Sequence, residues 1–336
     1  MMMEKIKKSE FENTEISINE DNYIINHNDN YFKMGLAEGQ LFEALYSGKD
    51  FDYILNTYNI TEEDLSRFIE ILRKNNIIGA PRKRKKNIFF YNIPLINADT
   101  LMNKITSFIK KNSKLFKLLF FMYNVIIIVG LLYFICNLSI IFSLDSVTLP
   151  IGQYIILYVL MLFSVILHEF SHGITCKLFG GKVGTMGFML IFFSPAFYCD
   201  ISGIRMINHK RKQIFTSFAG IYFNIFLVAL SAILYMITKK PLFASFLLLN
   251  LVMILSNIVP LIKLDGYWML SFATGITNLY SKSIKGINLI WKGKSREEKF
   301  IGWYGLVTIV FAVTSILSLL EGLFLFVNKI VKFLLT

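Results

Sequence analysis

The chain has 336 residues, of which 54% are apolar and 17% charged, and its mean hydropathy is +0.54. Soluble domains usually carry about a quarter charged residues. The composition therefore excludes an ordinary soluble protein, and it equally excludes a collagen or a disordered chain. The first 30 residues are polar and acidic and hold no apolar run of signal-peptide length, so we expect no secretory signal.

The charge changes sign along the chain. Residues 1–81 hold 8 Lys or Arg against 15 Asp or Glu, a net charge of −7, whereas residues 82–117 hold 10 against 1, a net charge of +9. We therefore expect a compact acidic domain over 1–81, a basic juxtamembrane linker over 82–117 and a membrane-embedded domain over 118–336.

The acidic domain has the pattern of a small α+β unit. β-type residues around a turn-like segment at 28–30 predict a hairpin within 16–34, and apolar residues at helical spacing predict a helix near 41–46. A capping box at 61–64 opens a second helix that ends at Asn75. The apolar face of that helix consists of Leu65, Phe68, Ile69 and Leu72.

The basic run Arg82–Lys86 has two interpretations. Such a run can bind nucleic acid, but this one lies close before an apolar segment and has no interleaved aromatic residues. Positive charge on the cytoplasmic flank of a membrane helix explains it better, with anionic lipid as a further attraction. We therefore expect the lipid bilayer as a partner and no nucleic acid.

Five segments without any Asp, Glu, Lys or Arg are each about 20 residues or longer, which is enough for a helix to cross a bilayer. They are Leu118–Leu144, Ser146–Leu167, Ile214–Thr238, Pro241–Ile262 and Phe300–Leu320. A sixth uncharged stretch, Val183–Cys199, is short and interrupted by glycine and proline. We expect a re-entrant hairpin sheltered by protein there, with a short sixth helix as the alternative.

Basic residues set the expected orientation. The loops 177–212 and 263–299 carry six and seven Lys or Arg, and such loops normally stay in the cytoplasm. The pattern predicts a multi-pass protein of the cell membrane with its N-terminal domain in the cytoplasm.

The second apolar segment ends in His168-Glu169-Phe170-Ser171-His172. Residues at i and i+4 of a helix share one face, so both imidazoles can reach one metal ion. Glu169 adjoins them and can act on a metal-bound water, which is the HExxH arrangement of zinc metalloproteases. A hydrogen-bonded pair of buried histidines, or an inactive relic of such a site, is the alternative interpretation.

Asp265 is the expected third ligand. It follows Pro260, which interrupts the fourth apolar segment and lets the chain bend. In the orientation above, the second and fourth segments both run inward, so His172 and Asp265 lie at similar depth. Catalytic zinc takes three protein ligands and keeps a fourth position for water, and His168, His172 and Asp265 supply three.

We assign no catalytic role to the remaining histidines, to the cysteines or to Glu321. We expect His27 and His209 to be solvated and Glu321 to end the last span or lie at the interface. The cysteines, at positions 136, 176 and 199, form no CxxC pair and are expected to be apolar filling.

Together, these motifs resemble the site-2 protease family of intramembrane zinc metalloproteases. The resemblance covers about 115–275 and rests on His168-Glu169-x-x-His172 and on Asn257-x-x-Pro260-x-x-x-Leu264-Asp265-Gly266. Phe197-Tyr198-Cys199-Asp200 and Ala219-Gly220-Ile221-Tyr222-Phe223-Asn224 resemble the peptide zinc metalloprotease branch associated with bacterial ribosomal-peptide clusters.

The family resemblance implies Zn²⁺ as cofactor, Glu169 as general base, Asp265 as third metal ligand, and Asn257 or Asn224 as polar support. Asn224 is equally well explained as a helix-packing residue. In the family a loop similar to Val183–Cys199 lies beside the active site, where we expect it to pair with an extended substrate. The acidic domain loosely resembles winged-helix-like domains that recognise leader peptides.

The sequence thus predicts a mainly α-helical polytopic membrane protein, with five or six transmembrane helices, a re-entrant hairpin and a small winged-helix-like α+β domain. Its predicted activity is hydrolysis of a peptide bond in a peptide precursor or a membrane-associated substrate. Two alternatives remain: regulated intramembrane proteolysis of a membrane-bound transcription regulator, and a non-enzymatic immunity or export factor on the same fold.

Overall fold

The structure, a computed structural model, describes residues 8–11, 14–19, 22–27, 30–78, 90–139, 149–191 and 194–335. The chain divides into two compact units, 1–251 and 252–336, and each is described by itself. The basic run at 82–86 lies outside the described residues.

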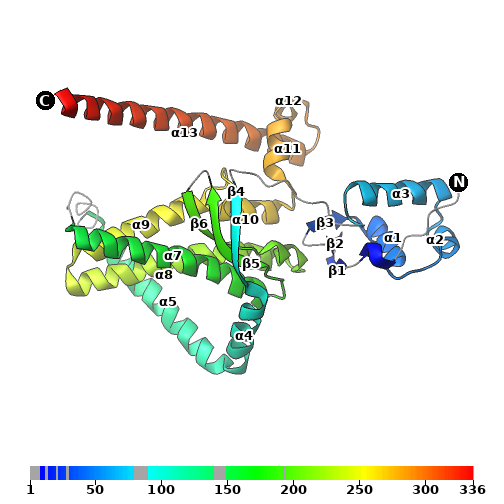
Figure 1. Ribbon diagram of the computed structural model, residues 1–336, viewed down its shortest axis with the longest axis horizontal. Coiled ribbons are helices and arrows are strands. Elements are labelled where there is room, and N and C mark those ends of the chain that lie inside the picture. Colours follow the sequence, from blue (N-terminus) through cyan, green and yellow to red (C-terminus); the bar gives the residue numbers. More distant parts are fainter. Residues whose placement is uncertain are drawn as a thin grey trace. The chain divides into compact units, whose positions relative to one another are not determined.

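The acidic N-terminal region opens with a short 3-10 helix, η1 (Lys8–Phe11), and three antiparallel strands in the order β1-β2-β3. Three helices follow (Figure 1). The bounds are β1 Thr14–Asn19, β2 Asn22–His27, β3 Asn30–Met34, α1 Leu36–Tyr46, α2 Phe51–Tyr58 and α3 Glu62–Lys74. The predicted hairpin corresponds to β2 and β3, while β1 and α2 were not predicted.

The α3 helix begins as its sequence indicates. Thr61 accepts a hydrogen bond from the Asp64 amide, and the Asp64 carboxylate accepts one from the Thr61 amide, which completes the capping box. Its apolar face packs into the core of this region. That core contains Ile25, Phe42, Leu45, Ile54, Leu65, Ile69 and Leu72, all buried.

Five helices among the described residues are long and apolar enough to cross a membrane. They are α5 (Ser113–Cys136), α7 (Ile151–Leu178), α8 (Lys210–Thr238), α9 (Pro241–Ile258) and α13 (Arg296–Leu335), the last over its segment up to Gly322. The α7 helix starts directly after Pro150 and continues beyond the uncharged stretch that ends at Leu167, so it carries the whole HExxH segment, as predicted. The chain is thus mainly helical and has the features of a multi-pass membrane protein.

The α8 helix is the centre of the first unit, because α5 and α7 both pack along it (Figure 1). Gly130 of α5 permits the close crossing with α8. A Cβ atom at Gly130 would lie 2.2 Å from the carbonyl oxygen of Ala229. Small residues at such crossings let membrane helices approach closely.

The segment Val183–Cys199 contains two strands, β5 (Thr185–Ile191) and β6 (Ser194–Cys199), so the alternative of a short sixth helix is wrong. The order of the three-stranded sheet is β4-β5-β6, all antiparallel. The first strand, β4 (Phe90–Asn97), comes from the predicted basic linker, and α4 (Ala98–Lys111) follows it. The β5 strand is therefore paired on both sides.

The second unit contains the Asp265 segment. The α9 helix ends at Ile258, before Pro260, and α10 (Asp265–Thr274) begins at Asp265 itself. Gly266 allows this turn, because a Cβ atom there would lie 2.3 Å from the Ile258 carbonyl oxygen. The short helices α11 (Leu279–Lys285) and α12 (Leu289–Lys292) pack against α13.

Candidate metal centre

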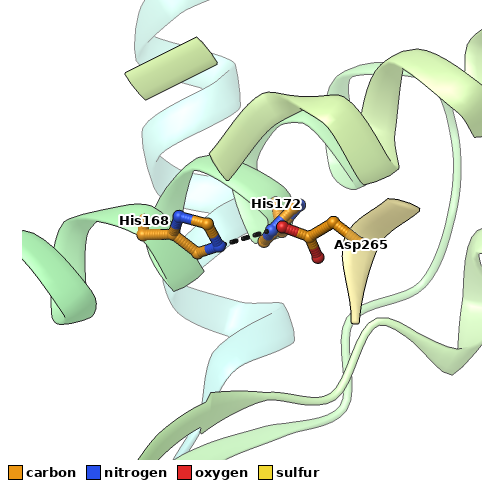
Figure 2. A group of neighbouring side chains, drawn as sticks. All are labelled: His168, His172 and Asp265. Carbon is orange, nitrogen blue, oxygen red and sulfur yellow. Dashed lines mark hydrogen bonds between the residues drawn. The ribbon is translucent and has the colours of Figure 1, made fainter. Parts of the chain in front are cut away.

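His168 and His172 lie one turn apart on the same face of α7, and both are at least 95% buried. Their Nε2 atoms face each other at 3.2 Å (Figure 2). The predicted i, i+4 pair is therefore present with converging nitrogens.

The other ring nitrogen of each histidine has a partner on α8. The Nδ1 of His172 lies 2.7 Å from the carbonyl oxygen of Thr216, and the Nδ1 of His168 lies 2.5 Å from the Oδ1 of Asn224. A carbonyl oxygen only accepts hydrogen bonds, so each Nδ1 carries the proton. In the neutral imidazoles, each Nε2 then presents a lone pair.

Two lone pairs that face each other repel unless a cation lies between them. Tetrahedral zinc with Zn–N bonds of about 2.05 Å places two ligand nitrogens about 3.3 Å apart. The observed separation of 3.2 Å fits this value. The hydrogen bonds from Nδ1 to oxygen acceptors are also the usual surroundings of metal-bound histidines.

Gly220 of α8 faces both Nε2 atoms. A Cβ atom at this position would lie 2.4 Å from the Nε2 of His168 and 2.4 Å from the Nε2 of His172. Only a glycine leaves the space in front of the two nitrogens open. A metal ion bound by both lone pairs would lie in this space.

Asp265 completes a group that could hold a metal ion. One ligand atom from each of His168, His172 and Asp265 lies within 4.8 Å of the other two (Figure 2). Two imidazoles and one carboxylate are a donor set that suits zinc and leaves a coordination position for water.

Glu169 is held by the end of the hairpin. Its Oε2 accepts a hydrogen bond of 3.0 Å from the backbone amide of Cys199, the last residue of β6. The β6 strand packs against α7 along this edge. The carboxylate is therefore oriented next to the two histidines by the sheet.

A second contact joins α4, α7 and the start of β5. The Asp99 carboxylate accepts hydrogen bonds from the Lys177 ammonium group at 2.7 Å and from the Val183 amide at 3.1 Å. Burial raises the pKa of Asp99, but these two hydrogen bonds, the positive charge of Lys177 and a hydrogen bond from Asn103 together outweigh it, so its pKa lies below the usual range. This ionised carboxylate ties the hairpin to the end of the HExxH helix.

The other candidate residues have varied surroundings. Asn257 donates a hydrogen bond to the Met253 carbonyl of its own helix, so its support of the site stays a prediction. His209 and Glu321 are exposed.

The expectation that His27 is solvated was wrong. Its side chain is 98% buried because β2 is buried on both faces, and its Nδ1 lies 2.8 Å from the Thr14 hydroxyl. Cys136 is exposed, whereas Cys176 and Cys199 are buried.

Several residues around the histidines were not predicted. Thr216 and Gly220 precede Asn224 at spacings of eight and four, so the three share one face of α8. A stripe of small and polar residues on an otherwise apolar helix was the available signal. Ser164 and Asn250, which contact Asn224, follow no recognisable motif.

Comparison with known proteins gives one related sequence. The chain is 27% identical over 205 residues to a protein of Bacillus subtilis (strain 168) named "Putative peptide zinc metalloprotease protein YydH", and the match covers 60% of this chain and 79% of that protein. No family model matches the chain, and no solved structure matches it. The similarity supports a zinc metalloprotease family in the broad sense.

We predict that Gly220→Ala abolishes metal binding, because the added methyl group would occupy the space in front of both Nε2 atoms. Zinc per purified chain should fall from about one to near zero. The control is Gly152→Ala on α7, where a Cβ atom meets nothing within 4 Å. Wild-type zinc content in a folded Gly220→Ala protein would contradict the assignment of this space.

Proposed function

We propose that this chain is an intramembrane zinc metalloprotease of the site-2 type. The observation that carries the proposal is the pair of Nε2 atoms 3.2 Å apart, with both Nδ1 protons directed to oxygen acceptors on α8. His168, His172 and Asp265 are the proposed ligands. The name of the Bacillus subtilis relative supports zinc as the metal and a peptide as the substrate.

Bound zinc would supply Lewis acidity and lower the pKa of a coordinated water to about 7. Glu169 is the proposed general base, because it adjoins His168 and its carboxylate is fixed by the Cys199 amide. It would accept a proton from the attacking water and transfer it to the leaving amine. Asn224 holds the His168 ring in the tautomer that ligates metal.

The proposed location is the cell membrane, with the N-terminal domain in the cytoplasm. The loops with many basic residues then lie on the cytoplasmic side, as the positive-inside rule requires. In this orientation the β5–β6 hairpin enters the membrane beside the metal site as a re-entrant element. Irregular backbone at that depth requires shelter by protein, and the pairing of β5 with β4 and β6 satisfies its backbone on both sides.

The β6 strand is the proposed edge for an extended substrate. Peptide groups of a strand alternate in direction. The Asp200 amide, directly after β6, donates to the carbonyl of Thr185 in β5, whereas the Cys199 amide points the opposite way, to Glu169. The Phe197 amide therefore also points away from β5. The β5 strand cannot offer such an edge, because β4 and β6 pair with it on both sides.

We further propose that the N-terminal domain recognises the leader of a peptide precursor. It contacts the loops at both ends of the hairpin: Glu15 pairs with Lys182 at 2.9 Å, and the Ser17 hydroxyl donates to the Met206 carbonyl at 3.1 Å. The Lys182 hydrogen bond lowers the pKa of Glu15. A peptide bound to this domain would thus be near the strands that lead to Glu169. Residues 1–81 have a net charge of −7, which favours a basic leader.

Glu169→Gln should retain zinc and lose activity, because an amide cannot accept the proton of the attacking water. Hydrolysis of a panel of fluorophore–quencher peptides in detergent micelles should fall at least about 100-fold. Asp265→Ala, measured in parallel, should lower zinc content instead. Wild-type turnover by Glu169→Gln would refute the mechanism, and a folded wild-type chain without zinc would refute the proposed function.

Phe197→Pro should lower hydrolysis about tenfold or more, because it removes the backbone donor that the proposed substrate strand needs. Phe197→Ala is the matched control, since it shortens the same side chain but keeps the amide. Both variants should bind zinc as the wild type does. Equal activities of the two variants would count against strand pairing at this edge.

Deletion of residues 1–80 should weaken precursor binding about tenfold or more, because the tethered recognition site is lost. Zinc content should not change, since every proposed ligand lies beyond residue 167. Binding is measured by fluorescence anisotropy of labelled precursor peptides with basic leaders. Unchanged affinity would refute leader recognition and leave the metal site unaffected.

A further inference from the structure

Three helices contribute side chains to a buried polar cluster next to the proposed metal site. We define this cluster as Ser164 of α7, Asn224 of α8 and Asn250 of α9, each at least 98% buried. Ser164 lies one helical turn before His168. Polar side chains are rare and costly among helices as apolar as these, so a cluster of three requires an explanation.

The cluster is closed by mutual hydrogen bonds. The Ser164 hydroxyl donates to the Oδ1 of Asn250 at 2.6 Å, and the Nδ2 of Asn224 donates to the same oxygen at 2.8 Å. Asn224 also donates to the Ser164 hydroxyl at 3.3 Å. The Nδ2 of Asn250 donates to the backbone carbonyl of Phe246 at 2.9 Å.

The orientation of the Asn250 amide fixes the direction of the other hydrogen bonds in the cluster. The Phe246 carbonyl accepts only, so it sets which end of the Asn250 amide carries the nitrogen. The Asn250 oxygen then attracts the nitrogen of Asn224. The Asn224 oxygen is left facing the Nδ1 of His168, where it requires a proton on that nitrogen.

We propose that Asn250 is a positioning residue for the metal site, which acts through Asn224 to set the tautomer of His168. This inference rests on the proposed zinc site and adds a residue that is not itself one of the three proposed metal ligands. If Asn250 lacked its oxygen, the Nδ2 of Asn224 would lose an acceptor. Rotation of the Asn224 amide, which brings Nδ2 to face His168, would then become favourable. The amide nitrogen would then face Nδ1 and favour the proton on Nε2, where it blocks the metal.

Asn250→Leu tests the proposal with the same number and branching of side-chain heavy atoms and with a side chain that suits a membrane helix. The zinc dissociation constant, measured by chelator competition on the full-length protein in detergent, should rise about 10- to 100-fold. Asn250→Asp should restore it, because a neutral carboxyl group offers the same acceptor and can donate to Phe246. The visible spectrum of bound Co²⁺ should change in Asn250→Leu and match the wild type in Asn250→Asp.

Ser164→Ala provides a second variant in the same cluster, with a smaller expected loss because Asn224 keeps its contact with Asn250. Ser231→Ala is the control: Ser231 is equally buried on α8, two turns beyond Asn224, and its replacement should leave zinc affinity unchanged. The proposal is overturned if folded Asn250→Leu binds zinc as tightly as the wild type, or if Asn250→Asp binds as weakly as Asn250→Leu. In both cases the zinc site of the wild type would stand, whereas a wild type without zinc would overturn both proposals.

Discussion

The hydrogen bonds on Nδ1 of His168 and His172 are the interactions on which the site depends. A neutral imidazole has one proton for two nitrogens, so a ring that donates at Nδ1 must present a lone pair at Nε2. The acceptors are the Thr216 carbonyl and the Asn224 amide, both on α8. The position of α8 against α7 therefore decides whether this pair of histidines can bind a metal at all.

This dependence explains why α8, a long and mainly apolar helix, carries a stripe of small and polar residues. Gly220 leaves space in front of the two Nε2 atoms, and Thr216 and Asn224 flank it by one turn on either side. A water molecule would satisfy such groups in a soluble protein, but the interior of a membrane offers few. The partners must come from the protein, and Ser164 and Asn250 supply them for Asn224.

The parts of the site that are local in sequence were predictable. The HExxH pair requires only helical periodicity, and the break before Pro260 requires only the loss of a backbone donor. The capping box at Thr61 was equally local. In contrast, the pairing of β4 with β5 joins residues about 90 to 100 positions apart, and no alternation of apolar and polar residues in the basic linker indicated it. Asn250 was missed for the same reason, because its partners lie on two other helices.

The burial of His27 shows how a correct local pattern can give a wrong environment. A histidine next to a turn of polar residues is normally solvated, but β2 is the central strand and is buried on both faces. One face packs on the helices of the N-terminal domain, with Ile25 in their core. On the opposite face, the neighbouring strand β1 places Glu15 and Ser17 against Lys182 and Met206. The sheet β1-β2-β3, whose central strand is buried on both faces, thus joins the helices of the N-terminal region to the segments that flank the hairpin, and the hairpin contacts Glu169 through the Cys199 amide.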